Sequence, residues 1–154
     1  MDAIESFWQS YLAGLPPEVD TSSLSYSAWP FGNRPDLADE LGALVLAGTK
    51  TATCTMTWEE ENVPSVGDIS VILDGQRRPI CIIQTIQVEI KPFDEIDAQF
   101  AYDEGEGDRS YEHWREEHWR YFSRICEASG RQFSGDMPII CERFRLLYSK
   151  SLEV

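Results

Sequence analysis

After Gly48 the sequence changes from a helical to a two-residue period, and this change constrains the fold more than any other feature. Upstream, Pro35 begins a segment whose leucines and valine fall on one helical stripe, and Gly48 is typical of a helix C-terminus. Downstream, threonine occupies every second position from Thr49 to Thr57. This alternation predicts a β-strand with one hydrated and one dry face.

The other elements also mix helix and strand, without the regular alternation of a parallel doubly wound sheet. The apolar spacing predicts helices over about 4–12, 35–47 and 111–125, a short helix within 92–102, and strands over about 49–57, 69–73, 80–90 and 139–148. The segments 18–27 and 28–32 are expected to be loops. We therefore expect an α+β fold, a small β-barrel or strongly curved sheet with helices packed outside it and over one mouth.

With 154 residues, of which 42% are hydrophobic, the chain has the size and composition of one domain, 1–154, that buries a core without disulfides. Thirteen basic and 27 acidic residues give it a net charge of -14. The field of such a protein repels polyanions, which argues against non-specific binding to duplex DNA or to an anionic membrane. It leaves room for a small, locally basic pocket within an acidic shell.

The first residues are acidic where a secretory signal would be basic, and no apolar run approaches the roughly 18 residues of a membrane span. We therefore expect a cytoplasmic protein without a membrane partner. The cysteines Cys54, Cys81, Cys126 and Cys141 form no CxxC pair. Buried free thiols are the favoured interpretation, with zinc binding and disulfides as the alternatives.

Lys50 has the same strand parity as the apolar residues Ala52, Cys54 and Met56. Because burial of an ammonium group without a partner costs several kcal/mol, such a lysine either snorkels from the strand end or lies in a cleft beside a carboxylate. Thr53 falls on the opposite face, so it meets Lys50 only if the chain turns or bulges between them. High β-propensity alone is the simpler explanation for Thr53.

The segment Asp103–Ser110 is the strongest anomaly, because it combines two glycines with four carboxylates just before the longest predicted helix. Glycines let the backbone approach a ligand closely, and binding and catalytic groups concentrate on such loops. The carboxylates could act as a general acid or base or hold a metal. A well-capped acidic loop at a helix N-terminus is the structural alternative.

Histidines and aromatic residues add weaker candidates. His113 and His118 lie roughly 140° apart on a helix, so they do not form a zinc-binding helix motif, and His118 is expected in the core. Arg109, next to the glycines, is a candidate ligand-binding residue. Trp29 and Phe31 could stack on a base, or they could fasten the second helix to the core.

Several motifs together resemble the ASCH domain family. They are Ala28–Gly32, Asp39–Leu41, Gly48–Thr53, Pro92–Glu95, Ala101–Ser110 and Trp114–Arg115. The turn with glycine, lysine and threonine is weak evidence alone, and its combination with the Glu104–Ser110 run is specific. The resemblance extends over a core of about 7–148.

This resemblance implies a PUA-like β-barrel of about five or six mostly antiparallel strands, with a cleft between barrel and helices. It also implies recognition of RNA or of modified nucleosides. Some relatives are amidohydrolases that remove the acyl group of N4-acylated cytidine with a lysine, a threonine three positions later and a later glutamate. These roles fall on Lys50, Thr53 and Glu104, with Glu106 or Asp103 as alternatives for the acid.

Two functions are therefore expected, and a regulatory protein-binding domain is the interpretation that remains if neither ligand class binds. The first is a hydrolase, amidohydrolase-like or ribonuclease-like, that acts on a nucleoside or on single-stranded RNA. The alternative is a non-catalytic module that reads RNA or a modified base. Expected ligand contacts are Trp29, Phe31, Thr51, Tyr102, Glu106, Arg109, Ser110 and Trp114. No cofactor is expected, and the sequence indicates neither a particular divalent metal nor an oligomeric state.

Overall fold

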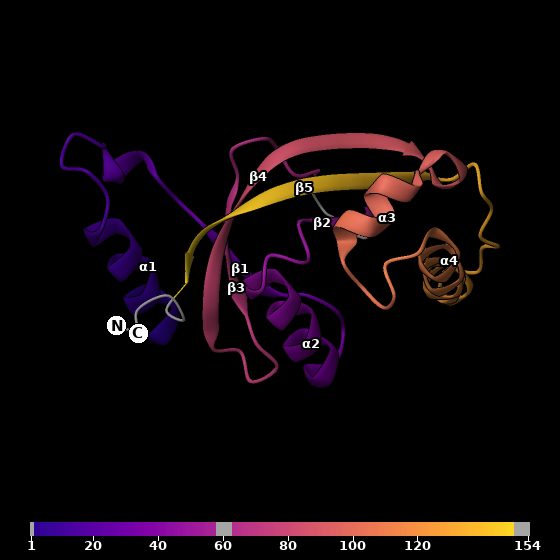
Figure 1. Cartoon of the computed structure of the whole chain (residues 1–154), viewed down its shortest axis with the longest axis horizontal. Helices are drawn as coiled ribbons and strands as arrows, with labels where there is room; N and C mark the ends of the chain where they lie inside the picture. The colour runs from indigo at the N-terminus through magenta and orange to yellow at the C-terminus, as the bar shows by residue number, and fades with distance from the viewer. Residues whose placement is uncertain (1, 58–62, 150–154) are drawn as a thin grey trace.

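The computed structural model describes residues 2–57 and 63–149, and five strands in these ranges form one curved sheet (Figure 1). In spatial order the strands are β1 (Ser27–Pro30), β3 (Ile69–Leu73), β4 (Pro79–Pro92), β5 (Pro138–Ser149) and β2 (Ala52–Met56). β1 runs parallel to β3, and the other neighbouring pairs are antiparallel. The edge strands β1 and β2 do not pair in the described ranges, so the sheet is an open, curled half-barrel. The predicted α+β, PUA-like fold is confirmed.

In residues 2–57 and 63–149, four α-helices and two short 3₁₀ helices surround the sheet. They are α1 (Ala3–Ala13), η1 (Thr21–Ser23), α2 (Pro35–Leu46), η2 (Phe93–Glu95), α3 (Ala98–Glu104) and α4 (Tyr111–Ala128). The Asp2 side chain accepts the Glu5 amide at the start of α1, and Ser110 accepts the His113 amide at the start of α4. These caps satisfy amides that have no partner within the helix. Within the described residues, no helix is long and apolar enough to cross a membrane.

The long strands β4 and β5 connect the two halves of the molecule (Figure 1). Their pairing shifts register between Thr85 and Gln87, where Ile86 lies between the paired positions. Such a bulge increases the local bend and interrupts the alternation of faces. Thr85 is consequently buried, whereas Ile86 is half exposed. The apolar face expected over 80–90 is therefore broken, although the strand itself lies where it was predicted.

The core has three clusters, each beneath different helices. Phe93, Trp114 and Phe122 belong to the cluster that α3 and α4 form with β2 and β5. α2 packs on a second cluster that contains Phe31, and α1 covers the third. The connection from α2 to β2 passes between the first two clusters, and it carries Lys50.

Two local predictions were wrong. The segment Ser27–Pro30 was expected in loops, but it forms the edge strand β1, because a parallel neighbour satisfies its backbone. The strand expected from Thr49 begins at Ala52 instead. The amides of Thr49 and Lys50 both donate to the carbonyl of Leu44 in α2, so these residues close the helix rather than extend the strand.

Candidate functional site

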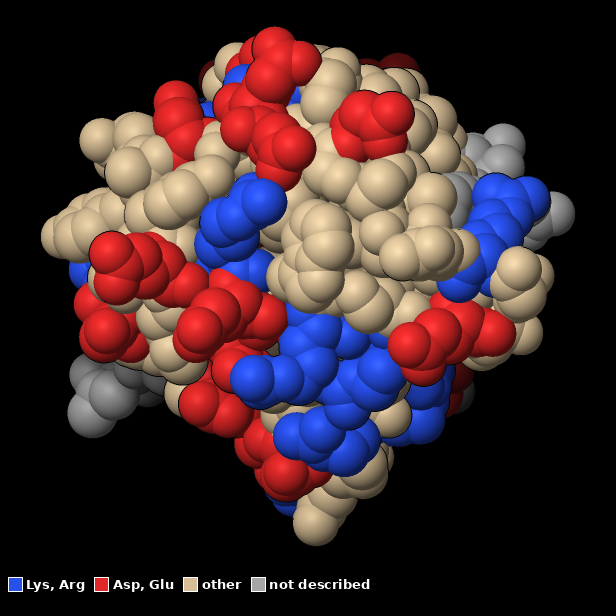
Figure 2. Space-filling view, turned by 90° about the vertical axis from the view of Figure 1, so that its right-hand side faces the viewer, with Lys and Arg blue, Asp and Glu red and all other residues tan. Residues whose placement is uncertain are grey.

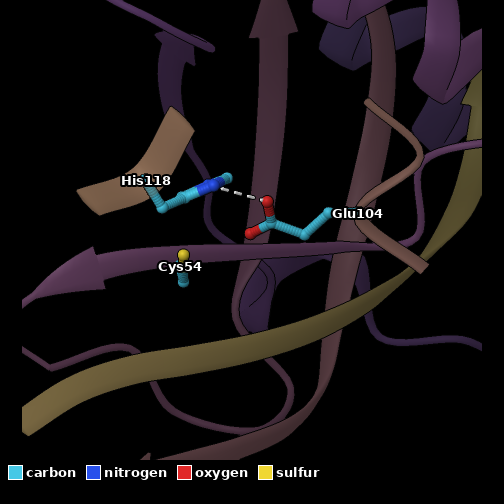
Figure 3. A group of neighbouring side chains, drawn as sticks. All are labelled: Cys54, Glu104 and His118. Atoms are coloured by element: carbon cyan, nitrogen blue, oxygen red, sulfur yellow. Dashed lines mark ion pairs between the residues drawn. The ribbon is translucent and has the colours of Figure 1, made fainter. Parts of the chain in front are cut away.

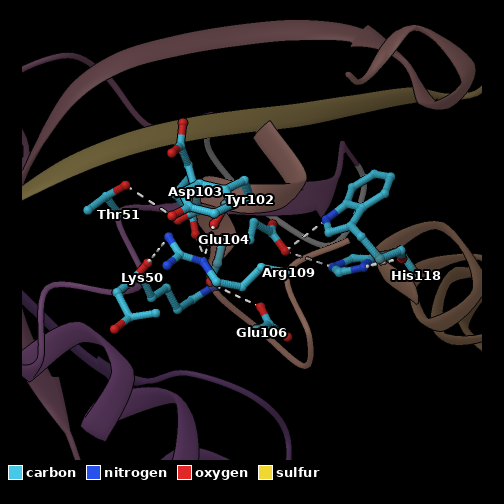
Figure 4. A network of polar contacts seen from close by, with 11 residues as sticks. Lys50, Thr51, Tyr102, Asp103, Glu104, Glu106, Arg109 and His118 are labelled. Atoms are coloured by element: carbon cyan, nitrogen blue, oxygen red, sulfur yellow. Dashed lines mark hydrogen bonds and ion pairs between the residues drawn. The ribbon is translucent and has the colours of Figure 1, made fainter. Parts of the chain in front are cut away.

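Lys50 is almost completely buried, with 1% of its side chain exposed. Its Nζ donates to the Ala52 carbonyl at 2.9 Å and to the Glu106 carboxylate at 2.8 Å, with the Glu104 carbonyl at 3.4 Å (Figure 4). The ring of Phe31 lies 5.4 Å from the same atom. The ammonium group therefore has an acceptor for each of its three protons.

Burial alone would lower the pKa of Lys50, but the carboxylates of Glu104 and Glu106 outweigh burial and raise that pKa. The lysine is therefore a charged ammonium at neutral pH. Lys50 does not snorkel from the strand end, because its amine points inward to the carboxylate of Glu106, an acid from a distant segment.

Glu104 is the last residue of α3 and is buried. Its Oε2 accepts the indole N–H of Trp114 at 3.0 Å and lies 3.0 Å from Nε2 of His118. Its Oε1 is buried without a hydrogen-bond partner among the described residues. Burial raises the pKa of Glu104, but His118 and Lys50 reverse this effect and hold the pKa below its usual range.

His118 completes this buried set from the opposite side, on α4. Its Nδ1 lies 2.8 Å from the carbonyl of Trp114, and its Nε2 faces Glu104. Burial lowers the pKa of His118, but the carboxylate of Glu104 raises it by more. With a carbonyl at one nitrogen and a carboxylate at the other, the imidazolium form satisfies both contacts. The expected core histidine is thus also an ion-pair partner of a candidate catalytic acid.

Cys54 lies on β2 beside Glu104 and His118 (Figure 3). Burial, followed by the charge of Glu104, raises the pKa of its thiol well above the usual value. Without a bound cation, Cys54 is therefore a neutral thiol and a poor nucleophile. All four cysteines are free thiols.

Two glycines let the segment after α3 approach its neighbours closely. Gly105 has a φ of 75°, and a Cβ atom there would lie 2.5 Å from the carbonyl oxygen of Thr49. Gly107 has a φ of 60°, and a Cβ atom there would lie 2.2 Å from the ring of His113. The glycines of the acidic segment are thus required by backbone conformation and close contact, and they bring Glu106 to Lys50.

Arg109 covers the outer side of this segment. Its Nε donates to the Tyr102 carbonyl at 3.0 Å, and its guanidinium carbon lies 3.5 Å from the centre of the Tyr102 ring. Its Nη2 also reaches the carbonyl of Thr49 at 3.4 Å. Tyr102 is 49% exposed, so the stacked pair presents a flat polar surface to solvent close to Lys50.

The remaining predicted site residues have different positions. Phe31 is buried and packs edge-to-face on Trp29, with ring centres 4.8 Å apart, so the pair fastens the second helix. The Thr51 hydroxyl lies beside the site, 3.4 Å from the Asp103 carbonyl. Thr53 alternates with Ala52 and Cys54 on β2 and lies opposite Glu142 of β5, on the other face from the Cys54 thiol. In the described residues, no hydrogen bond connects Thr53 to Lys50 or Glu104.

The structure therefore brings together Lys50, Glu104, Glu106 and Arg109, and it leaves Thr53 on the other face. The contact of His118 with Glu104 was not predicted from the sequence. The signal was a polar residue on the apolar stripe of α4. Its partner could not be identified, because that partner lies in α3 and only the packing of the two helices brings them together.

The open half-barrel and the helices around Lys50 define a PUA-like α+β domain. A family model of the ASCH domain matches residues 27–148. The structure is similar to the ASCH domain of Lactobacillus crispatus JV V101, with a TM-score of 0.89, 32% identity and 96% of each chain covered. It is also similar to a protein of Enterococcus faecalis V583, with a TM-score of 0.80, 36% identity, and 99% of this chain and 93% of that chain covered.

No curated protein matches the chain. The family match covers most of the sequence, and both solved structures share more than 30% identity with it. The chain belongs to the ASCH domain family.

We predict that Gly105→Ala lowers the free energy of unfolding by at least about 2 kcal/mol, because it adds a backbone collision to the strain of a positive φ. Gly130→Ala is the matched control, since Gly130 has a φ of 74° and no atom lies within 4 Å of the position that a methyl group would take there. It should cost about 1 kcal/mol. Urea unfolding measures both, and equal losses would show that the contact with Thr49 does not constrain the loop.

We predict that Trp114→Phe costs about 1–3 kcal/mol of unfolding free energy, because it removes the N–H donor of a buried carboxylate and retains an aromatic ring. Trp119→Phe is the control on the same helix, with an indole that is 38% exposed. It should cost less than about 1 kcal/mol. The midpoints of urea unfolding give the comparison, and a larger loss for Trp119→Phe would contradict the assigned role of Trp114.

Proposed function

We propose that the chain binds a modified nucleoside or a short single-stranded RNA beside Lys50 and hydrolyses the N4-acyl amide of cytidine there. One observation carries this proposal: an ammonium group with 1% exposure is paired at 2.8 Å with Glu106, whose side chain is 30% exposed. A ligand that displaces the Glu106 carboxylate would meet a desolvated ammonium group. Such a group polarises a carbonyl more strongly than a hydrated one does.

The reaction would use Lys50 and Glu106. Glu106 would take a proton from a water molecule, and the resulting hydroxide would add to the acyl carbon. Lys50 would stabilise the oxyanion that forms. The proton held by Glu106 would then pass to N4 as the carbon–nitrogen bond breaks, which yields a carboxylic acid and cytidine.

Glu106 suits the role of the acid better than Glu104 in this geometry. The Glu104 carboxylate contacts Trp114 and His118, and only its backbone carbonyl approaches the lysine amine. Glu104 would therefore be a positioning residue that holds α3 against α4. Glu106 is one of the two residues, with Asp103, that were named above as alternatives to Glu104 for the acid.

The ligand class is supported by the surroundings of the site. The ASCH domain is an RNA-binding, PUA-like family, and the stacked Tyr102 and Arg109 offer a flat surface for a base. The net charge of -14 favours a small ligand over a long RNA. The face in Figure 2 nevertheless carries a cluster of Lys and Arg side chains, with acidic side chains on either flank.

A non-catalytic reader of RNA or of a modified base is the second candidate. The position of Thr53 favours it, because the hydroxyl that the hydrolase resemblance requires lies on the other face of β2. In a reader, Lys50 and Arg109 would donate to the base, and Tyr102 would stack on it.

We predict that the purified chain releases acetate from N4-acetylcytidine and that Lys50→Met lowers the rate at least about 100-fold. The control is Lys91→Met, which removes a partly exposed lysine of β4 that pairs with Glu89. Its rate should match that of the unaltered chain. Acetate release is followed by chromatography, with circular dichroism to establish that both variants fold.

One outcome would contradict the hydrolase, and a second would contradict the residues assigned to the reaction. Absence of release above the Lys50→Met background would leave the reader as the function. A rate loss in folded Thr53→Val that equals the loss in Lys50→Met would place the reacting atoms on the other face of β2. The assignment of Glu106 would then be wrong.

We predict that Tyr102→Ala weakens binding of cytidine or a short oligonucleotide by about 1–3 kcal/mol, because it removes the stacking surface. Tyr102→Phe retains the ring and should bind like the unaltered chain. Titration calorimetry measures both, and binding of the oligonucleotide should weaken as salt is added. Equal affinities for Tyr102→Ala and the unaltered chain would place the base elsewhere.

A further inference from the structure

Three side chains next to the proposed site, two of them buried and the third, His118, partly buried, take no chemical step in the proposed hydrolysis. Cys54 of β2, Glu104 of α3 and His118 of α4 point toward one another (Figure 3), and their sulfur, oxygen and nitrogen atoms all lie within 4.8 Å. Thiolate, carboxylate and imidazole are the ligands that Zn²⁺ prefers in proteins. We propose that these three residues bind one Zn²⁺ ion.

The unpartnered oxygen of Glu104 is the second, independent observation. Oε1 is buried and accepts no hydrogen bond from a described residue, while Oε2 is held by Trp114 and His118. Figure 3 shows this free oxygen on the side of Glu104 that faces Cys54. A buried carboxylate oxygen without a donor is costly. A cation between Glu104 and Cys54 would remove that cost.

The outer contacts of the cluster also suit a metal. Nδ1 of His118 lies 2.8 Å from the Trp114 carbonyl, which leaves Nε2 directed at the cluster. The indole of Trp114 donates to Oε2 of Glu104. Zinc-bound histidines and carboxylates in proteins are oriented by such hydrogen bonds to a carbonyl and from an N–H group.

The charges of the cluster allow Zn²⁺ to replace two protons. Zn²⁺ would replace the thiol proton of Cys54 and one ring proton of His118, so two protons leave and the net charge stays the same. Lys50 does not oppose this exchange strongly, because its ammonium is paired with Glu106. Tetrahedral zinc holds sulfur and nitrogen ligands about 3.6 Å apart. The widest separation in the cluster is at most 4.8 Å, so it would shorten by no more than about 1 Å.

The ion would have three protein ligands, one from each of β2, α3 and α4, and water in the fourth position. The ion would therefore connect α3 and α4 to the edge strand β2, next to the residues around Lys50. This site is distinct from the reacting pair, and it does not rest on the proposed hydrolysis.

Co²⁺ titration of the full chain, freed of metal and with its thiols reduced, tests the proposal. Co²⁺ occupies zinc sites, and a bound thiolate gives it a charge-transfer band in the near ultraviolet. The expected result is a band that saturates at one equivalent and disappears when Zn²⁺ is added. Absence of this band in the unaltered chain overturns the proposal, whatever the variants do.

Variants then assign the ligands. Cys54→Ala should lose the band, and its affinity for Zn²⁺ should fall about 100-fold or more. Cys81→Ala is the matched control, since Cys81 is a buried free thiol in a different core cluster, and it should retain both. A band that survives in Cys54→Ala, or that disappears in Cys81→Ala, would place the metal elsewhere.

His118→Gln provides a ligand variant that keeps the thiol, for use if Cys54→Ala fails to fold by circular dichroism. It should keep the band, which comes from the thiolate, while binding Zn²⁺ about 100-fold more weakly. Unchanged affinity in this variant contradicts the proposal. Because every readout is spectroscopic or a binding constant, the result is independent of any hydrolytic activity.

Discussion

The buried charge of Lys50 is the constraint on which the rest of the site depends. Removal of an ammonium group from water costs several kcal/mol unless acceptors replace the water molecules. The acceptors here come from Ala52, Glu104 and Glu106, and the last two are more than fifty positions away in the chain. To bring them to the lysine, the end of α3 must touch the end of α2. Gly105 allows that contact, since a side chain there would collide with Thr49.

Glu104 connects this arrangement to the core beneath α4. Its backbone carbonyl faces Lys50, while its carboxylate faces Trp114 and His118. Trp114 is stacked in turn on Phe93, with ring centres 5.3 Å apart, so the orientation of the carboxylate is fixed by aromatic packing. The two buried sets therefore share one residue. A change in the packing of α4 would reach the lysine through Glu104, although α4 itself makes no hydrogen bond to Lys50 in the described residues.

Much of this arrangement could be predicted from local signals in the sequence. The apolar spacing after Pro35 and the apolar run over 69–73 predicted a helix and a strand. Lys50 shares its strand parity with apolar residues, and this mismatch indicated a buried charge. The short strand β1 could not be predicted, because its pairing with β3 is long-range. The cluster of Cys54 and His118 was missed for the same reason. Each residue alone is ordinary in an apolar stretch, and only the tertiary packing shows that Glu104 lies between them.

The balance of charge in the proposed site would restrict the ligands that can bind there. Without a metal, the positive charges of Lys50 and His118 match the negative charges of Glu104 and Glu106, so the buried group is neutral overall. A ligand that displaces Glu106 must replace an anionic acceptor, which a carbonyl or phosphate oxygen can do and a cation cannot. The acidic surface works against long polyanions at the same time. A small ligand with an electron-rich oxygen satisfies both conditions, because it gains the attraction of Lys50 without carrying many charges past the surface.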